Sequence, residues 1–433
     1  MKVSCSGPRL VVTRVGTQPG ITGACVAPVS HCRVCRSSRL AEVLDFGDLV
    51  LTGVFPSSPG DTVSSGRVRL YLCQECGLVQ LGDTFPTEEM YGDNYGYRSG
   101  LNSSMVAHLR RIASRMQDRA HLEAGDVILD IGANDGTLLR SYEDCGLVKV
   151  GIDPTIEKFR EFYADDVTAV ADFFSADSFD RVSSQRARLI TSITMFYDLE
   201  DPVGFAKAIR HCLTDDGLWY FEQSYMPWML RSGAYDTICH EHLEYYSLTT
   251  IRRILDEAGL HLLDAATNAV NGGSISVLAG VEPGDGPSVY ARWLLEQEDA
   301  DRVHSPESWV EFRQRVKSRQ RDLRSLLGRL NSSGSSVMAL GASTKGNVLI
   351  QTTPVSAELV SKVGDVNSYK FGRYLPGSGI PIVPEAEVLS ERPDYLLILP
   401  WHFRETFMES LAPYLAKGGR LIFPLPDLEV VGY

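Results

Sequence analysis

Short apolar runs alternate with amphipathic stretches through the middle of the chain. The segments 126–132, 147–154, 188–197 and 217–224 contain DVILDIG, LVKVGIDP, RLITSITMFY and GLWYFEQS, which are rich in β-branched, aliphatic and aromatic residues. Such runs, separated by helical stretches, predict buried strands of a parallel sheet covered by helices.

The last third of the chain begins with a different pattern. The segment 306–330 carries charged residues between apolar residues at helical spacing, which predicts a long amphipathic helix. The sequence NSSGSS at 331–336 predicts a linker after it. The segments 336–351, 393–400 and 418–426 then predict a second strand–loop–helix unit. The apolar positions of the predicted helix are Trp309, Phe312, Val316, Leu323 and Leu327.

At 433 residues the chain is longer than a single hydrophobic core usually supports. We therefore expect an α/β protein with several units. The predicted divisions are a loose tail at 1–30, a cysteine-containing subdomain at 31–90, a strand–helix core at 91–305 and a second α/β domain at 306–433.

Composition narrows the class of protein. The apolar content of 44% and charged content of 22% are typical of globular proteins. A net charge of −13 disfavours general nucleic-acid binding and anionic membrane surfaces. The sequence has no apolar run of about 18 residues, so we expect no transmembrane helix. Nine cysteines, an odd number, favour reduced thiols, and we expect a cytoplasmic protein.

Four cysteines form two matched pairs. Cys32 and Cys35 lie in CRVC, and Cys73 and Cys76 lie in CQEC. Each pair places two thiolates on one turn, and the two turns together supply the four sulfur ligands that Zn²⁺ prefers in closed structural sites. The sequence therefore predicts a structural zinc site, with a redox pair or incidental cysteines as the alternative.

A glycine-containing turn follows the first predicted strand of the middle segment. DVILDIGANDGTLL at 126–139 predicts a strand, a turn and the start of a helix, with Asp130 ending the strand. Gly132 and Gly136 would let the backbone approach a ligand closely. The next predicted strand ends at Asp153, where a carboxylate can accept hydrogen bonds from ribose hydroxyls. A generic strand-to-helix turn is the alternative.

This turn resembles the D-x-G-x-x-x-G motif of class I S-adenosylmethionine-dependent methyltransferases. It is neither the G-x-G-x-x-G of dinucleotide-binding folds nor a P-loop, because the P-loop lysine is missing. The resemblance implies that S-adenosylmethionine is bound here. The residues expected to bind it are Asp130, Gly132, Asn134, Gly136, Asp153, Asp172, Phe173 and Phe196.

The segment ICHEHLEYYS at 238–247 concentrates residues that can move protons or bind metals. It lacks the H-E-x-x-H spacing of zinc proteases, and adjacent Glu241 and His242 cannot readily share one ion. General acid–base chemistry is therefore favoured over metal catalysis. A polar loop whose histidines satisfy backbone groups is the alternative.

Taken in order, these motifs resemble the zinc-containing deoxysugar C-methyltransferases of antibiotic biosynthesis. Those enzymes use S-adenosylmethionine to place a methyl branch at C-3 of a dTDP-linked 4-keto-6-deoxyhexose. The resemblance extends from residue 32 to the end of the chain. It rests on CRVC, CGLVQL, YGDNYGYRSG, DIGANDG, HEHLEYYS, NGGSISV, GASTKGN and PGSGIPI.

The resemblance implies roles for single residues. His242 is expected to be the base that removes the C-3 proton, with Glu241 as its orienting or electrostatic partner. Tyr95 is the expected partner of the substrate oxygen, and Tyr97 is the second choice. His240 is expected to contact the sugar or support the loop. Tyr246 is expected at the sugar site.

Two positions depart from family members that act on 3-amino sugars. Those members tend to carry a histidine where this chain has Tyr197 and a tyrosine where it has Cys239. Both positions are expected near the sugar, so the departures favour a 3-hydroxy sugar of the mycarose type. A nucleophilic role for Cys239 is weakly motivated, since proton abstraction and methyl transfer need no covalent intermediate.

The C-terminal unit contains a second turn suited to phosphate. In ALGASTKGNVL at 339–349, backbone N–H groups at a helix N-terminus could bind a diphosphate. The segment 365–382 adds cations and aromatic rings that could pair with phosphate and stack on thymine. By resemblance this Rossmann-like domain binds the dTDP-sugar; a structural cap is the alternative. The residues expected there are Ser343, Thr344, Lys345, Asn347, Lys370 and Arg373.

Three hypotheses follow. The first is a C-methyltransferase acting on C-3 of a dTDP-4-keto-2,6-dideoxyhexose through an enolate. The second adds an NADPH-dependent reduction of the 4-ketone. The third is a non-catalytic zinc-knuckle scaffold that binds a partner, which the set of Asp130, Gly132, Gly136 and Asp153 disfavours. The family resemblance also implies a monomer.

Overall fold

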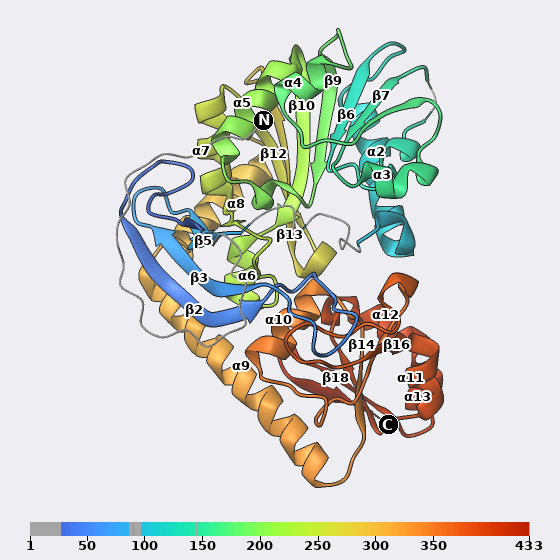
Figure 1. Ribbon diagram of the computed structural model, residues 1–433. Coiled ribbons are helices and arrows are strands. Elements are labelled where there is room, and N and C mark those ends of the chain that lie inside the picture. The colour runs from blue at the N-terminus through green and yellow to red at the C-terminus, as the bar shows by residue number, and fades with distance from the viewer. Residues whose placement is uncertain (1–26, 86–89, 91–96, 144, 433) are drawn as a thin grey trace, which may run out of the picture.

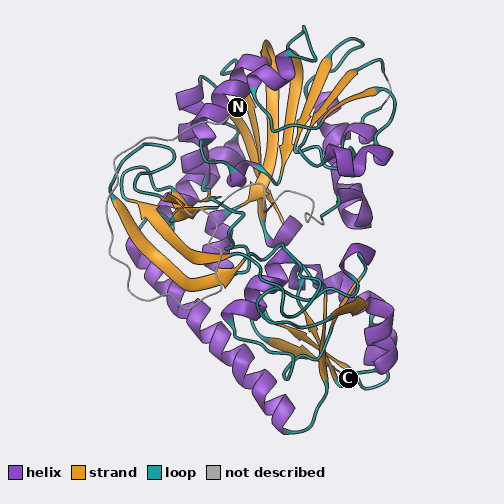
Figure 2. Cartoon of the chain, viewed as in Figure 1, coloured by secondary structure: helices purple, strands orange, loops and turns teal. Residues whose placement is uncertain are grey.

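The computed structural model describes residues 27–85, 90, 97–143 and 145–432. Three sheet-containing units follow one another along the chain, and a long helix connects the second to the third (Figures 1 and 2). We call them the N-terminal, middle and C-terminal units. Most of the tail predicted at 1–30, and Tyr95, lie outside the described residues.

The N-terminal unit is an antiparallel sheet that recruits a strand from far along the sequence. Its strand order is β11-β4-β3-β2, and β11 comes from the middle of the HEHLEYYS segment. The segment that carries His242 is thereby attached to the cysteine-containing unit. The strands are β2 (Leu40–Val50), β3 (Ser65–Cys73), β4 (Val79–Leu81) and β11 (Glu244–Tyr245), and β1 (Ala27–Pro28) pairs separately with β5 (Asp83–Thr84).

The middle unit contains a sheet of seven strands in the order β12-β13-β10-β9-β6-β7-β8. Strands β10, β9, β6, β7 and β8 run parallel, while β13 is antiparallel to both its neighbours. This is the class I methyltransferase fold, a Rossmann-like sheet closed by one antiparallel strand. The strands are β6 (Val127–Ile131), β7 (Val148–Ile152), β8 (Val167–Val170), β9 (Ala187–Ile193), β10 (Leu213–Ser224), β12 (His261–Asn268) and β13 (Ser274–Gly280).

Helices cover this sheet because each presents an apolar face to it. On α7, for example, Leu248, Ile251, Ile254 and Leu255 recur at helical spacing and are fully buried. The helices of this unit are α2 (Ser103–Arg119), α3 (Ile156–Phe159), α4 (Ala176–Asp180), α5 (Pro202–Cys212), α6 (Met226–Ser232), α7 (Leu248–Ala258) and α8 (Val289–Ala300).

The helix predicted directly after the first glycine turn does not form. Residues 139–141 make only a short 3₁₀ turn, η2 (Leu139–Ser141), and Tyr142 after it is extended and buried. Side-chain hydrogen bonds compete with helix formation here, since Thr137 N–H and Oγ1–H both donate to Asp135 Oδ1, at 3.2 and 2.6 Å.

The connecting helix α9 (Pro306–Ser332) has the five predicted apolar residues buried on one face. It extends two residues into the predicted linker and ends where Gly334 adopts a φ of +77°. One guanidinium of α9 touches both neighbouring units: Arg319 Nη1 donates to the Ser232 carbonyl at 2.7 Å, and Nη2 lies 3.1 Å from Asp427 Oδ1. Figure 1 shows α9 beside β2 of the N-terminal unit.

The C-terminal unit is a smaller Rossmann-like sheet with the order β16-β15-β14-β17-β18-β19, in which only β19 is antiparallel. Its strands are β14 (Val337–Leu340), β15 (Val363–Asp365), β16 (Ile382–Pro384), β17 (Tyr395–Ile398), β18 (Arg420–Phe423) and β19 (Glu429–Val431). Its helices are α10 (Thr344–Thr352), α11 (Glu385–Glu391), α12 (Arg404–Ser410) and α13 (Ala412–Leu415). The predicted domain boundaries themselves stay predictions.

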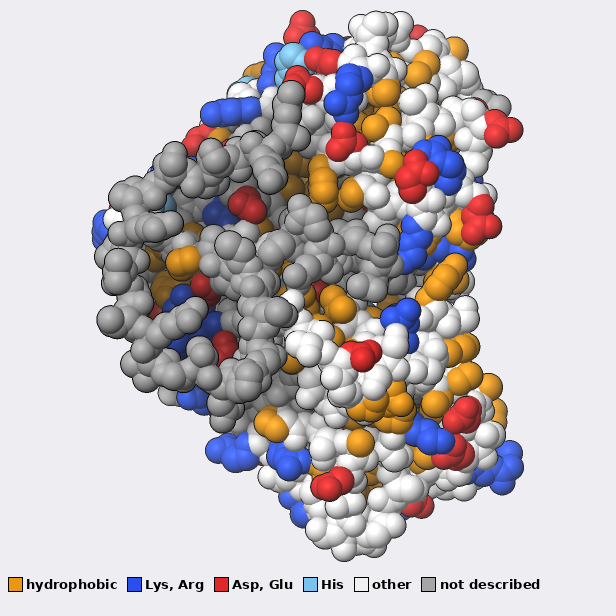
Figure 3. Space-filling model, in the orientation of Figure 1, with side chains coloured by type: hydrophobic (Ala, Val, Ile, Leu, Met, Phe, Trp, Pro, Cys, Tyr) orange, Lys and Arg blue, Asp and Glu red, His pale blue; other side chains and the backbone are white. Residues whose placement is uncertain are grey.

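On the face seen in Figure 3, basic and acidic side chains of the described residues are interspersed. Among the described residues, none of the helices combines the length and apolarity needed to cross a bilayer.

Candidate active site

The four predicted metal ligands converge. All four Sγ atoms lie within 4.8 Å of one another, with Cys32 and Cys76 at 3.4 Å and Cys35 and Cys73 at 3.5 Å. A tetrahedron with Zn–S bonds of about 2.3 Å requires sulfur separations of about 3.8 Å, so a zinc ion fits with small adjustments. Four thiolates would leave no open coordination position, which is typical of a structural site.

The turn after β6 is shaped for close approach by a ligand. Gly132 and Gly136 both have φ near +72°, a conformation that disfavours side chains. Asp153, at the end of β7, accepts the Asn134 backbone N–H at 2.9 Å through Oδ2. Its Oδ1 accepts both the N–H and the hydroxyl of Thr155, at 2.6 and 2.5 Å, so the carboxylate is fixed beside the turn with acceptor capacity left on Oδ2.

A pocket opens on this turn, and we call it the Asp130 pocket. Burial raises the pKa of Asp130 to about 7, opposed by a hydrogen bond from Thr191 Oγ1 at 2.7 Å. Asn134 is central to the turn's shape, because its Oδ1 accepts the Ser99 N–H at 2.9 Å and its Nδ2 donates to the Tyr97 carbonyl at 3.2 Å. The residues around the pocket include Tyr97, Met105, Asp130, Gly132, Thr137 and Thr194.

His242 is held in one tautomer. Its Nδ1 lies 2.6 Å from the carbonyl oxygen of Thr237; this oxygen can only accept, so Nδ1–H donates the hydrogen bond and Nε2 is the unprotonated nitrogen. The ring packs against Tyr197 with centroids 4.3 Å apart. Burial lowers the pKa of His242 to about 4, helped by nearby Lys345 and opposed by Glu241. The imidazole is therefore neutral and able to accept a proton.

Glu241 is an electrostatic partner of His242 rather than the group that orients it. Its Oε2 accepts a hydrogen bond from Thr52 Oγ1 at 3.2 Å, and the orienting contact to His242 comes from Thr237. Gly53 lies close to it, since a Cβ there would lie 2.8 Å from Glu241 Oε1 and the carboxylate would have to shift. Thr344 Oγ1 would lie 3.6 Å from that same Cβ, so residues from all three units meet here.

A second pocket, the His242 pocket, joins the middle and C-terminal units. Lys345 is half-buried and borders it, its ammonium group donates to the Asn271 carbonyl, and desolvation lowers its pKa. Asp236 opposes that shift. A partly desolvated cation and a neutral imidazole therefore share one pocket. The residues around it include Tyr197, Trp228, Asp236, His242, Lys345 and Trp401.

Several residues predicted for catalysis or ligand binding lie in packed interior positions instead. His240 is fully buried, with Nε2 3.1 Å from the Gly66 carbonyl and its ring on Phe85, so it supports the loop. Burial keeps the pKa of the Cys239 thiol well above its usual range, which opposes a nucleophilic role. Phe196 and Tyr246 stack on each other in the core, at 5.2 Å, away from both pockets.

The predicted phosphate-binding residues of the C-terminal unit divide into three roles. Ser343 is the N-cap of α10, its Oγ accepting the Gly346 N–H at 3.0 Å, and Thr344 follows at the helix start. Asn347 is buried and donates to the Thr52 carbonyl at 2.8 Å, so it connects two units. Lys345 lies in the His242 pocket, as described above.

The two predicted cations of segment 365–382 also connect units. Lys370 Nζ donates to the Ala342 carbonyl at 2.7 Å and lies 5.1 Å from the Phe55 ring centre. Arg373 Nη1 donates to the Phe55 carbonyl at 2.9 Å. Only Lys370 contacts the GASTKGN turn, through the Ala342 carbonyl, and the pairing of both cations with phosphate stays a prediction.

The remaining predicted cofactor residues lie at the edge of the sheet. Asp172 is ion-paired with Arg181 at 2.6 Å, and Phe173 is half exposed. Tyr97, the second choice for the partner of the substrate oxygen, borders the Asp130 pocket rather than the His242 pocket.

Sequence reasoning missed three residues of the His242 pocket. Thr237 acts through a backbone carbonyl, which leaves no side-chain signal. Asp236 accepts the indole N–H of Trp401 at 2.8 Å, a contact between residues 165 positions apart. Trp401 belongs to no recognisable motif, and only the packing of the C-terminal unit on the middle unit places it beside the His242 pocket.

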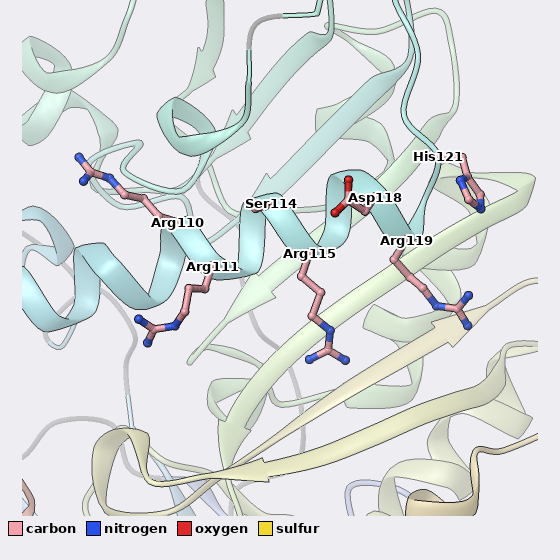
Figure 4. Close-up of a pocket in the computed structure, with 7 residues that line it drawn as sticks. All are labelled: Arg110, Arg111, Ser114, Arg115, Asp118, Arg119 and His121. Atoms are coloured by element: carbon pink, nitrogen blue, oxygen red, sulfur yellow. The ribbon is translucent and has the colours of Figure 1, made fainter.

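A basic hollow on α2 is separate from this chemistry. Figure 4 shows the side chains of Arg111, Arg115 and Arg119 extending in one general direction from the helix. Arg115 lies 3.5 Å from Asp264. No predicted site residue borders this hollow.

Comparisons with known proteins agree with this arrangement. Residues 32–91 match a family described as a zinc binding domain, residues 102–265 a methyltransferase domain, and residues 269–426 the C-methyltransferase C-terminal domain. The C-methyltransferase NovU of Streptomyces niveus is 28% identical over 416 residues, which cover 94% of this chain and 98% of NovU. The chain is therefore similar to the C-methyltransferases along nearly its whole length. The resemblance to the zinc-containing deoxysugar members is thereby confirmed.

Solved structures give weaker likenesses. The chain is 16% identical to one from the complex of the Haloferax volcanii Trm112 activator with a methyltransferase, over 41% of this chain and 94% of that one, at a TM-score of 0.32. The CcbJ methyltransferase of Streptomyces caelestis is 14% identical over 40% of this chain and 88% of its own, at a TM-score of 0.31.

Proposed function

We propose that this C-methyltransferase transfers a methyl group from S-adenosylmethionine to C-3 of a dTDP-4-keto-2,6-dideoxyhexose. One observation supports it above the others: a neutral, tautomer-fixed His242 and a half-buried Lys345 share a pocket near the carboxyl ends of β9 and β10. That edge of a parallel sheet is where ligands bind in such folds.

In this proposal Nε2 of His242 accepts the proton from C-3 of the sugar. The carbonyl at C-4 makes that proton acidic, because the electron pair left behind moves onto the C-4 oxygen as an enolate. The Thr237 carbonyl stabilises the imidazolium that forms, since it already accepts a hydrogen bond from His242 Nδ1–H at 2.6 Å.

Lys345 is the group best placed to stabilise the enolate. Its ammonium is buried and has Asp236 nearby to keep it charged. A cation aimed at developing negative charge is worth more in a water-poor pocket than in solvent. This assignment replaces the predicted pairing of Lys345 with diphosphate, which Ser343, Thr344 and the backbone of the turn would then hold.

The Asp130 pocket is the proposed site of the methyl donor. Gly132 and Gly136 let the donor approach the backbone, and Asp153 offers the remaining acceptor site of Oδ2 to a ribose hydroxyl. Bound S-adenosylmethionine supplies the methyl group that C-3 receives.

Tyr197 supports the choice of a 3-hydroxy sugar. Its ring lies against His242 and borders the same pocket, so it is near the atoms attached to C-3. Cys239, the other departure from the 3-amino members, is buried and does not border the pocket. The NADPH-dependent reduction has no comparable support, since the matched families are methyltransferase and zinc binding domains.

The test uses the purified zinc-loaded protein, S-adenosylmethionine and a dTDP-4-keto-2,6-dideoxyhexose. We expect a product with one added methyl group on C-3, identified by NMR. With S-adenosylhomocysteine in place of the donor, incubation in D₂O should exchange the C-3 proton faster than the C-5 proton, which is also adjacent to the ketone. A methyl group on oxygen, or equal exchange at both carbons, would contradict the proposal.

A further inference from the structure

A metal ligand and the proposed base are connected through one arginine. Arg33 follows Cys32 directly in the sequence, and Leu243 follows His242 directly. Arg33 is only 3% exposed, and its backbone N–H donates to Oε1 of buried Gln80 at 2.8 Å. Arg33 is thus the direct sequence neighbour of a predicted zinc ligand, and Leu243 is the direct sequence neighbour of the proposed base.

The Arg33 guanidinium reaches across β4 to the segment that carries His242. Nη1 donates to the Leu81 carbonyl at 2.8 Å and lies 3.4 Å from the Leu243 carbonyl. Nη2 donates to Thr84 Oγ1 at 3.0 Å, and Nε lies 3.5 Å from Glu244 Oε1. One planar group thus contacts the N-terminal sheet and both residues that follow His242.

The backbone of Leu243 connects the Arg33 guanidinium to residues that line the His242 pocket. Its carbonyl also accepts the Leu81 N–H at 2.8 Å, and its N–H donates to the Tyr197 carbonyl at 2.8 Å. The Tyr197 ring in turn packs on His242, with centroids 4.3 Å apart. A shift of the backbone at Leu243 would therefore move both the base and the ring beside it.

The Arg33–Glu244 pair is better explained by positioning than by stability. The Arg33 side chain is 4% exposed and that of Glu244 is 0% exposed. Desolvation of two buried ionisable groups usually cancels most of their attraction, so such a pair often specifies one arrangement rather than adding free energy.

We propose that Arg33 is a positioning residue that couples the zinc knuckle to the His242 base. The four cysteines fix the backbone at Arg33, and the guanidinium fixes the backbone after His242, so the metal site sets the position of Nε2. The kinetic part of this inference rests on the proposed function.

The test compares Arg33→Met with Arg39→Met. Arg39 belongs to the same knuckle region but is exposed and pairs with Glu75 at 2.7 Å, which makes it a matched control. For each variant, bound zinc, the Kd of S-adenosylhomocysteine, kcat and the KM of the sugar nucleotide are measured. Arg33→Met should retain zinc and cofactor affinity, keep KM within about threefold and lose about 10–100-fold in kcat, the range expected when a reacting group is misplaced by about 1 Å.

A second readout does not depend on the reaction. The rate of His242 carbethoxylation by diethyl pyrocarbonate, followed by peptide mass spectrometry, reports how the ring is held. It should change at least about threefold in Arg33→Met and stay constant in Arg39→Met. If the wild-type protein does not methylate C-3, the proposed function fails, but this comparison still decides the coupling.

Two results would overturn the inference. One is that Arg33→Met loses zinc in proportion to its activity, because Arg33 would then only support the metal site. The other is unchanged kcat and unchanged His242 reactivity. If Arg33→Met does not fold, Glu244→Met removes the other partner of the contact and is judged by the same measurements.

Discussion

The Nδ1 atom of His242 lies 2.6 Å from the carbonyl oxygen of Thr237. This contact assigns the proton to Nδ1 and leaves Nε2 as the acceptor in the pocket. We therefore expect His242→Asn to lower kcat by about 10²–10⁴-fold, the usual loss when a positioned base is removed.

The control for this variant is His211→Asn, since His211 is a surface residue whose Nε2 lies 3.0 Å from Asp180 Oδ2. S-adenosylhomocysteine affinity, measured by calorimetry, should be unchanged in both variants. A parallel loss of cofactor binding in His242→Asn would mean that the fold had been damaged.

The low pKa of His242 predicts a pH dependence of activity. Burial lowers this pKa to about 4, so the base stays unprotonated well below the ordinary histidine value of about 6.5. The acidic limb of the kcat/KM profile should accordingly lie below pH 6.5. A limb centred near 6.5 would show that His242 titrates as an exposed histidine and is not the buried base.

The same shift predicts a pH dependence of stability. Between about pH 6.5 and pH 4 the unfolded chain binds a proton at His242 that the folded chain does not, so the free energy of unfolding should fall as the pH falls through this window. Above pH 6.5 this contribution is constant. Urea unfolding at several pH values should show a weaker dependence in His242→Gln than in the wild-type protein.

Lys345 should affect chemistry more than binding. If it stabilises the enolate, Lys345→Met should lower kcat and C-3 deuterium exchange by about 10²–10³-fold, as loss of an oxyanion-stabilising group does elsewhere. A diphosphate ligand would instead raise the KM of the sugar nucleotide and leave kcat nearly constant. Lys207→Met, at an exposed position of α5, is the control.

The cysteine cluster should govern folding. Cys73→Ser removes one of four converging ligands and should reduce bound zinc, soluble yield and the apparent melting temperature. Cys145→Ser is the matched control, because Cys145 lies outside the cluster. Full zinc occupancy in Cys73→Ser would contradict the assignment of the site.

Asp153 should determine cofactor affinity. Asp153→Asn weakens the acceptor offered to the ribose and the bond to the Asn134 N–H, so the Kd of S-adenosylhomocysteine should rise about 10–100-fold. Asp215→Asn, at a fully exposed carboxylate, should have no effect. An unchanged Kd in Asp153→Asn would contradict the placement of S-adenosylmethionine in the Asp130 pocket.

Short sequence patterns predicted those features of the fold that depend on residues close together in the sequence. The paired cysteines, the D-x-G turn after β6 and the buried face of α9 each depend on residues close in sequence, and all three are found in the structure. The helix expected at 139 failed because Asp135 and Thr137 bond to each other, a competition that apolar periodicity does not register.

The assembly of the site could not be read from the chain. Glu241 and His240 lie beside His242 in the sequence, yet neither orients it. Glu241 bonds to Thr52, and His240 bonds to the Gly66 carbonyl. Lys345 enters the pocket from a separate unit, and Trp401 meets Asp236 there. These placements follow from how three units pack, which no single motif encodes.

Helix α9, with 27 residues, is about 40 Å long and lies along the N-terminal and middle units before entering the C-terminal one. A rod of this length, pinned by Arg319 at both neighbours, keeps the two Rossmann-like sheets at a set spacing. A substrate would then have to be long enough to contact both units. The free monosaccharide, which can occupy only the site of one unit, should therefore be turned over far more slowly than the nucleotide-linked sugar.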